Sequence, residues 1–174
     1  MTELKKRIES AYNKLEQMTK DIPGYKGYKD KEVRREADKL LRLKVANELQ
    51  EQRRRLNSLE VKLANSGRLG VLLVLDRSLM RLQLLIDRLK TASYGYAGLF
   101  AAVKVREAEL DVLYNQDAAL LDGVGKVKAL IDAVAAAEQD AELTKAGSEL
   151  LDALEEMNDS FSKRQDAILE TPVA

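Results

Sequence analysis

The sequence predicts an all-α fold: an antiparallel bundle of about five long amphipathic helices with coiled-coil-like packing. Apolar residues recur at alternating steps of three and four along most of the chain, which places them on one face of a helix. No stretch alternates apolar and polar residues over more than a few positions, so we expect no β-sheet. The chain is 33% charged and 45% hydrophobic and has only 2 prolines, a composition typical of long packed helices.

The first two helices are expected over residues 4–18 and 30–65. The apolar face of the first consists of Leu4, Ile8, Ala11, Leu15 and Met18. Pro23 follows this helix and ends it, because proline lacks an amide donor and disfavours helical geometry at the preceding residue. Asp30 suits the N-cap of the second helix, and Gly67 suits its C-terminal cap.

Three more helices are expected over residues 72–89, 98–134 and 143–168. The third helix carries leucines and one isoleucine at heptad spacing. In the fourth, Gly123 and Gly125 each cost about 1 kcal/mol in a helix interior. The apolar phase nevertheless continues across them, so we predict one long helix there. The fifth helix repeats its apolar residues at steps of three and four in the same way.

A chain of 174 residues suits one domain with a substantial core, and we expect residues 1–174 to form it, with 171–174 as a frayed tail. Short connectors favour antiparallel neighbours around one elongated core. The alternative architecture is an extended dimer in which the second and fourth helices project as coiled-coil arms.

The chain contains no cysteine and no histidine. Disulfides, thiolate nucleophiles, Cys/His zinc sites and Ser-His-Asp triads therefore cannot be built. We expect no enzyme activity, no cofactor and no metal. No run reaches about 18 apolar residues and the start lacks a secretory signal, so a cytoplasmic location is expected.

Two segments combine tyrosine with glycine, although aromatic residues make up only 5% of the chain. They are "IPGYKGYK" at 22–29 and "SYGYAG" at 93–98, and an up-and-down bundle would bring them to the same end. Tyrosine has a large apolar face and a polar tip, which suits either a cap on the core or a binding rim. The candidate binding residues are Tyr25, Lys26, Tyr28, Tyr94 and Tyr96.

Charge is distributed unevenly along the chain. Residues 1–90 carry 22 Lys and Arg against 13 Asp and Glu, a net charge of +9, and residues 91–174 carry 7 against 16, a net charge of −9. Acidic residues interleave with the basic ones in the second helix, which argues against nucleic-acid binding. The simplest interpretation pairs the basic second helix with the acidic fifth, within one chain or across a dimer.

Acidic residues of the fifth helix follow one stripe: Glu149, Asp152, Glu156 and Asp159. Their spacing also allows a magnesium interpretation. Carboxylates on a single helix do not form an octahedral cage, so that alternative is the weaker one.

The fourth helix has charged residues at expected core positions. An unpaired buried charge is costly, so these residues either lie at the surface or form a polar layer with partners. The residues of this possible layer are Arg106, Glu107, Tyr114 and Asp117.

The function that we expect is non-enzymatic: a cytoplasmic helical scaffold or adaptor that acts through protein–protein contacts or self-association, including as a homodimer. One alternative is a peripheral, membrane-associated protein of the stress-response kind, with Arg77, Arg81 and Arg88 beside an apolar helical face. Another is a small-ligand binder at the tyrosine-rich end of the bundle.

Overall fold

The computed structural model describes residues 31–92 and 107–169, and the surroundings of side chains within 39–92 and 118–163. These residues form four α-helices, one 3-10 turn and no strand: α2 (Lys31–Asn65), η1 (Leu69–Val71), α3 (Leu72–Thr91), α5 (Glu107–Ala136) and α6 (Asp140–Leu169). The predicted all-α bundle is confirmed with four helices rather than five. The helix expected over 4–18 lies outside the described residues, as does the stretch expected to begin the fourth helix at 98.

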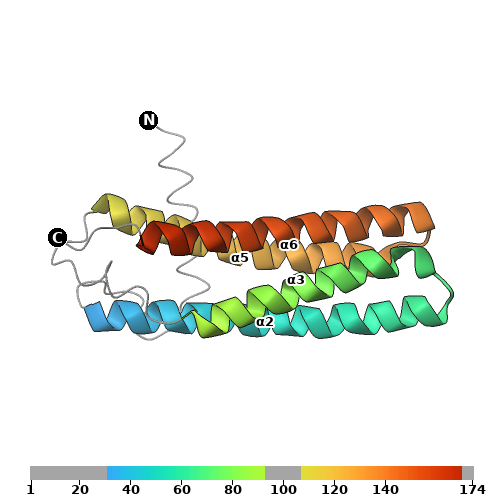
Figure 1. The fold of residues 1–174 in the computed structure, drawn as a ribbon, viewed down its shortest axis with the longest axis horizontal. Coiled ribbons are helices and arrows are strands. Elements are labelled where there is room, and N and C mark those ends of the chain that lie inside the picture. Colours follow the sequence, from blue (N-terminus) through green and yellow to red (C-terminus); the bar gives the residue numbers. More distant parts are fainter. Residues whose placement is uncertain (1–30, 93–106, 170–174) are drawn as a thin grey trace.

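The four helices form two antiparallel hairpins, α2 with α3 and α5 with α6, whose connectors lie at the same end of the bundle (Figure 1). The hairpins pack with α3 along α6 and α2 along α5, and each of these pairs runs parallel (Figure 1). In the described part of the chain, α2 and α6 occupy diagonal corners, as do α3 and α5. The expected pairing of the basic second helix with the acidic fifth is therefore wrong within one chain.

One apolar core runs along the bundle axis, and all four helices contribute to it. Its fully buried large side chains include Leu41, Leu49, Leu56, Leu75, Leu82, Leu85, Ile86, Leu89, Ile131, Leu143 and Phe161. On α3 these positions recur at steps of three and four, as the sequence predicted. Burial of these side chains is the main source of the stability of the bundle.

The C-terminal end of α2 is closed by a Schellman motif centred on Gly67. The Gly67 amide donates to the Ala64 carbonyl at 3.1 Å, and the Arg68 amide donates to the Leu63 carbonyl at 3.0 Å. Gly67 has a φ of 77°, which only glycine adopts at little cost. The predicted glycine cap is confirmed.

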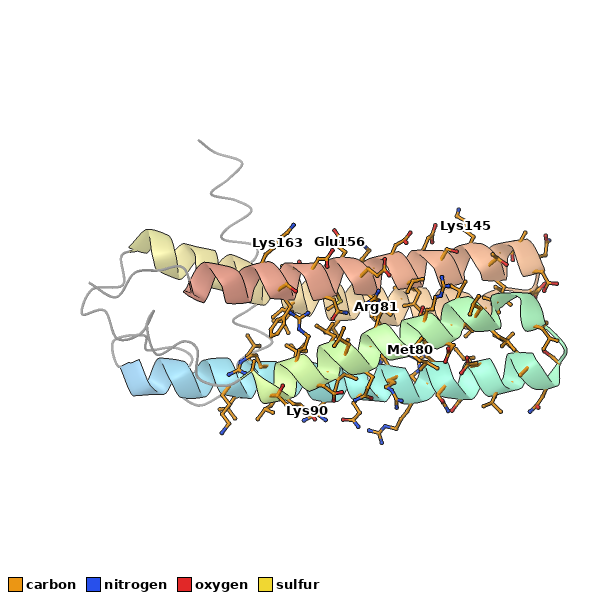
Figure 2. All side chains as sticks on the ribbon, in the orientation of Figure 1. Met80, Arg81, Lys90, Lys145, Glu156 and Lys163 are labelled. Atoms are coloured by element: carbon orange, nitrogen blue, oxygen red, sulfur yellow. The ribbon has the colours of Figure 1, made fainter. Side chains whose placement is uncertain are left out.

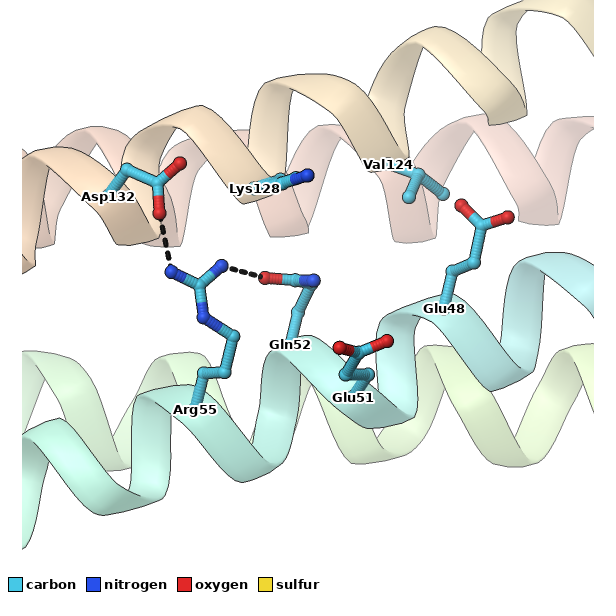
Figure 3. Close-up of a pocket in the computed structure, with 7 residues that line it drawn as sticks. All are labelled: Glu48, Glu51, Gln52, Arg55, Val124, Lys128 and Asp132. Carbon is cyan, nitrogen blue, oxygen red and sulfur yellow. Dashed lines mark hydrogen bonds and ion pairs between the residues drawn. The ribbon is translucent and has the colours of Figure 1, made fainter.

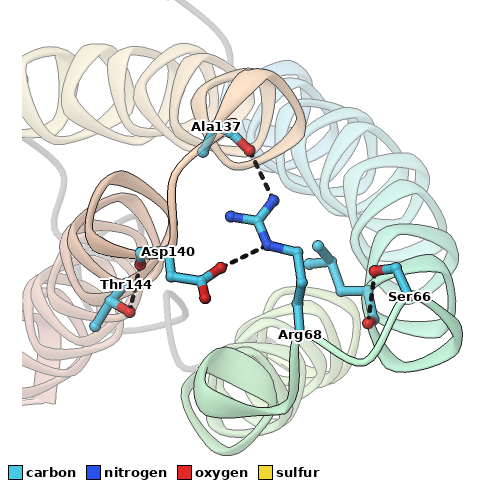
Figure 4. A network of polar contacts seen from close by, with 6 residues as sticks. Ser66, Arg68, Ala137, Asp140 and Thr144 are labelled. Carbon is cyan, nitrogen blue, oxygen red and sulfur yellow. Dashed lines mark hydrogen bonds and ion pairs between the residues drawn. The ribbon is translucent and has the colours of Figure 1, made fainter.

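Arg68 joins the two connectors at this end of the bundle (Figure 4). Its Nε donates to Asp140 Oδ1 at 2.7 Å, and its Nη1 donates to the Ala137 carbonyl at 2.9 Å. Asp140 is the first residue of α6, and a negative charge at that position interacts favourably with the helix dipole. One guanidinium therefore binds a carbonyl that follows the last turn of α5 and neutralises the carboxylate at the start of α6.

Arg42 of α2 is buried and caps the far end of α3. Its Nη1 donates to the Leu89 carbonyl at 3.3 Å and to the Ala92 carbonyl at 2.6 Å. A positive charge at a helix C-terminus satisfies carbonyls that have no intrahelical partner. Arg42 belongs to the basic second helix, and its burial is a finding of the structure.

A polar layer also ties α3 to α6. Arg88 Nη1 donates to the Asn158 carbonyl at 3.0 Å, and Nη2 donates to Ser162 Oγ at 2.8 Å. The Arg88 guanidinium lies 5.2 Å from the centroid of the Phe161 ring. Asn158, only 5% exposed, donates in turn to the Arg81 carbonyl at 3.1 Å.

The fourth predicted helix is continuous through both glycines, since α5 runs from Glu107 to Ala136. The two glycines have different surroundings. A Cβ on Gly123 would lie 2.6 Å from Met157 Cε, whereas a Cβ on Gly125 would have no neighbour within 4 Å. Gly123 therefore allows α6 to approach α5 closely, and Gly125 faces open space.

This difference predicts opposite outcomes for two alanine substitutions. Gly125→Ala should raise the free energy of unfolding by about 0.5–1 kcal/mol, because alanine loses less backbone entropy in a helix. Gly123→Ala should yield no such gain, because buried Met157 must move. Urea denaturation of both variants measures the difference, and equal gains at both positions would contradict the close approach of α5 and α6.

Candidate interaction surface

The tyrosine–glycine residues Tyr25, Lys26, Tyr28, Tyr94 and Tyr96 lie outside the described residues. The helix ends that flank the two segments are described. α2 begins, and α3 ends, on the side of the bundle away from the two connectors (Figure 1). α3 ends beside Arg42, about three helical turns after Lys31.

The described residues include only part of the polar layer predicted for the fourth helix. Arg106 lies outside the described residues. Glu107, Tyr114 and Asp117 belong to α5, but the surroundings of their side chains are not described. The polar layer that the structure does place, around Arg88 and Asn158, is on α3 and α6.

A polar groove of about 480 Å³ lies between α2 and α5 (Figure 3). Its lining consists of Glu48, Glu51, Gln52, Arg55, Val124, Lys128 and Asp132. Arg55 crosses the groove to bind Asp132 and donates to Gln52 Oε1 at 2.8 Å. Ligand pockets are usually apolar with a few polar groups. This groove has opposite charges and one apolar residue, which favours a solvated seam between helices.

The acidic stripe of α6 is exposed, and its carboxylates point to solvent or to nearby lysines. Glu156 pairs with Lys126 at 3.1 Å and Glu149 with Lys145 at 3.9 Å. Among the described residues, no three Asp or Glu side chains gather in a way that could hold a metal ion. The stripe is therefore a charged outer surface.

Among the described residues, most of the exposed large hydrophobic side chains lie along η1 and α3, and one more, Val61, lies on α2. We call the set Leu69, Leu73, Met80 and Leu84 the α3 stripe; these residues are 65%, 63%, 57% and 43% exposed. Their spacing places them on one side of the helix, opposite the core residues. Figure 2 shows Met80 and Arg81 on α3, and Glu156 and Lys145 along the outer edge of α6. Exposed apolar side chains that share one helix face are typical of an interaction surface.

Sequence reasoning noticed the apolar run at the start of α3 but assigned it mainly to the core. The signal that it missed is a second set of apolar residues on α3, which does not follow the heptad positions of the core residues. Leu75, Leu82 and Leu89 follow the core phase and are buried. Leu73 and Met80 are also seven residues apart, but they lie two positions before the core set and face outward.

The two hairpins carry opposite net charge. Residues 31–92 contain 15 Lys and Arg and 8 Asp and Glu, a net charge of +7. Residues 107–169 contain 5 and 15, a net charge of −10. Ion pairs such as Arg81 with Glu155, 3.4 Å apart, join the two hairpins. The contact between the hairpins is therefore a contact between a net basic and a net acidic pair of helices.

Glu60 on α2 is a partly buried carboxyl whose pKa is raised. Partial burial raises its pKa, and the negative charge of Asp76 on α3 raises it further. A raised pKa means that the folded state favours the protonated form. Ionised Glu60 therefore destabilises the fold at neutral pH, and this penalty is absent below its ordinary titration range.

Glu60→Gln should accordingly raise the free energy of unfolding at pH 7, by less than about 1 kcal/mol because the site is partly solvated. The gain should disappear at pH 3, where Glu60 is protonated in both states. Thermal unfolding at the two pH values checks this. A gain of equal size at both pH values would show that packing, rather than charge, is responsible.

No known protein family, curated protein or solved structure matches this chain. Within residues 31–92 and 107–169, no helix is long and apolar enough to cross a membrane.

Proposed function

We propose that this chain is a non-enzymatic helical scaffold or adaptor that acts through protein–protein contacts or self-association. The observation that carries the proposal is the α3 stripe, a set of large apolar side chains exposed on one side of the bundle. The absence of cysteine and histidine from the sequence agrees with a role in binding rather than catalysis. A cytoplasmic location and coiled-coil-like helix packing belong to the same proposal.

Sedimentation velocity over a wide concentration range, combined with affinity capture and Met80→Glu as the matched variant, tests this function. We expect either self-association or a defined partner, weakened at least tenfold by Met80→Glu. The exposed Met80 makes no contribution to the core, so the variant should fold normally. A strictly monomeric chain that retains no partner would overturn the proposal.

A second candidate function is attachment to an anionic membrane surface. The observation that favours it is the position of the α3 stripe on the basic hairpin, beside exposed Arg77 and Arg81. Flotation with vesicles of phosphatidylserine and phosphatidylcholine tests it. We expect binding that weakens with salt, and a chain that stays at the bottom of the gradient would exclude this candidate.

A further inference from the structure

The α3 stripe has the same spacing in both directions along the chain. Its centre is the pair Asp76 and Arg77. The two inner members of the stripe, Leu73 and Met80, lie three residues outside this pair, one on each side. The two outer members lie four residues further out. A second copy of this segment that runs antiparallel to the first therefore presents its apolar residues at the same levels and its central charges in the opposite order.

The two central charges have no ion-pair partner of their own. Asp76 and Arg77 are both exposed, and in the described part of the chain neither forms an ion pair. The charge that acts on Asp76 is the like charge of Glu60 on α2. Between the ends of the stripe the one other charged residue is Arg81, which pairs with Glu155. The charges along this part of α3 therefore cancel, although the hairpin as a whole is basic, and one carboxylate and one guanidinium remain unpaired.

We propose that two copies of this chain form a dimer in which their α3 stripes meet, with the two α3 helices antiparallel and a two-fold axis between Asp76 and Arg77. This inference rests on the proposed function and names a second copy as the partner. Leu73 of each copy comes level with Met80 of the other, and the outer members of the stripe come level in the same way. Asp76 of each copy comes level with Arg77 of the other, so the unpaired carboxylates and guanidinium groups form one neutral cluster.

The symmetric spacing and the central charges select a second copy over other occupants of the stripe. A two-fold contact buries the same patch on both copies, so the patch must be complementary to itself. A membrane surface requires exposed apolar residues, but it requires neither equal spacing about a centre nor an acidic residue there. A contact of one helix face with another is at the lower end of the range for stable interfaces. We therefore expect a dimer that dissociates on dilution and does not grow into larger assemblies.

Two charge-reversal variants of the full chain, Asp76→Arg and Arg77→Asp, test the arrangement. The first puts two basic residues of each copy at the centre of the dimer, and the second puts two acidic residues there. Like charges should therefore weaken each homodimer by about tenfold or more. An equimolar mixture restores opposite charges across the axis and should form a 1:1 heterodimer about as stable as the wild-type dimer. Sedimentation velocity with one variant fluorescently labelled measures this; both positions are exposed, and circular dichroism confirms folding.

The control is Lys145→Asp, which makes the same change of charge as Arg77→Asp at an exposed site along the outer edge of α6 (Figure 2). It lies outside the stripe and should dimerise like wild type. Met80→Glu should weaken the wild-type dimer, because it puts a charge on the stripe itself.

The possible failures of this inference differ from a failure of the proposed function. A wild type that dimerises through Met80, but whose two charge-reversal variants stay monomeric when mixed, would overturn the two-fold arrangement and leave the proposed function standing. Wild-type association that neither charge reversal weakens, or that extends beyond dimers, would do the same. A monomeric wild type whose vesicle binding is lost in Met80→Glu would assign the stripe to a membrane instead. A monomeric wild type with no partner would overturn both.

Discussion

Replacing Leu82 with alanine is expected to lower the free energy of unfolding by about 2–5 kcal/mol, since removing a buried leucine loses its burial energy and leaves a cavity. Leu82 is 0% exposed and lies in the middle of α3. Because a small domain is stable by only about 5–15 kcal/mol, such a loss would be a large part of the total.

Leu84→Ala is the matched control for this prediction, because Leu84 is the same residue type, two positions along the same helix, and 43% exposed. Its loss should stay within about 0.5 kcal/mol, as for most surface substitutions. Urea denaturation, at concentrations where the chain is monomeric, compares the two. Similar losses for Leu82→Ala and Leu84→Ala would contradict the orientation of α3 in the bundle.

Phe161→Ala is expected to have an effect of similar or greater size, about 3–5 kcal/mol. Phe161 is 2% exposed, and its ring lies against the Arg88 guanidinium, which itself binds Asn158 and Ser162 of α6. The substitution should therefore remove apolar burial and also loosen the polar layer between α3 and α6.

Phe161→Leu provides the comparison, because it keeps a buried apolar side chain and removes only the ring. We expect it to retain more than half of the stability that Phe161→Ala loses. Thermal and urea unfolding of both variants give the values. A Phe161→Ala variant that is no less stable than Asp159→Ala, which alters an exposed neighbour, would show that Phe161 does not anchor α6.

The structure separates the arginines that bind backbone carbonyls of other helices from those on the outer surface. Arg42 and Arg68 both neutralise helix ends, and Arg88 stabilises the contact between α3 and α6. Arg77 and Arg81 lie on the exposed side of α3. Sequence alone does not separate these two groups, because residue type does not show whether a guanidinium reaches a carbonyl on another helix.

Much of the fold was predictable because local periodicity reports local structure. The recurrence of apolar residues identified the helices, and an uninterrupted phase across Gly123 and Gly125 correctly predicted that α5 is continuous. The glycine cap at Gly67 was predictable for the same reason, since a helix end needs a residue that tolerates positive φ.

The sequence by itself determined an all-α chain with the helices α2, α3, α5 and α6. It also determined that cysteine and histidine chemistry is absent, and that a basic half is followed by an acidic half. Only the tertiary structure decided that α3 lies beside α6 and that α2 lies diagonal to it. Periodicity states which side of a helix is buried, but it does not state which other helix covers that side. The choice of neighbour depends on packing between residues far apart in the chain, and that choice left the α3 stripe exposed.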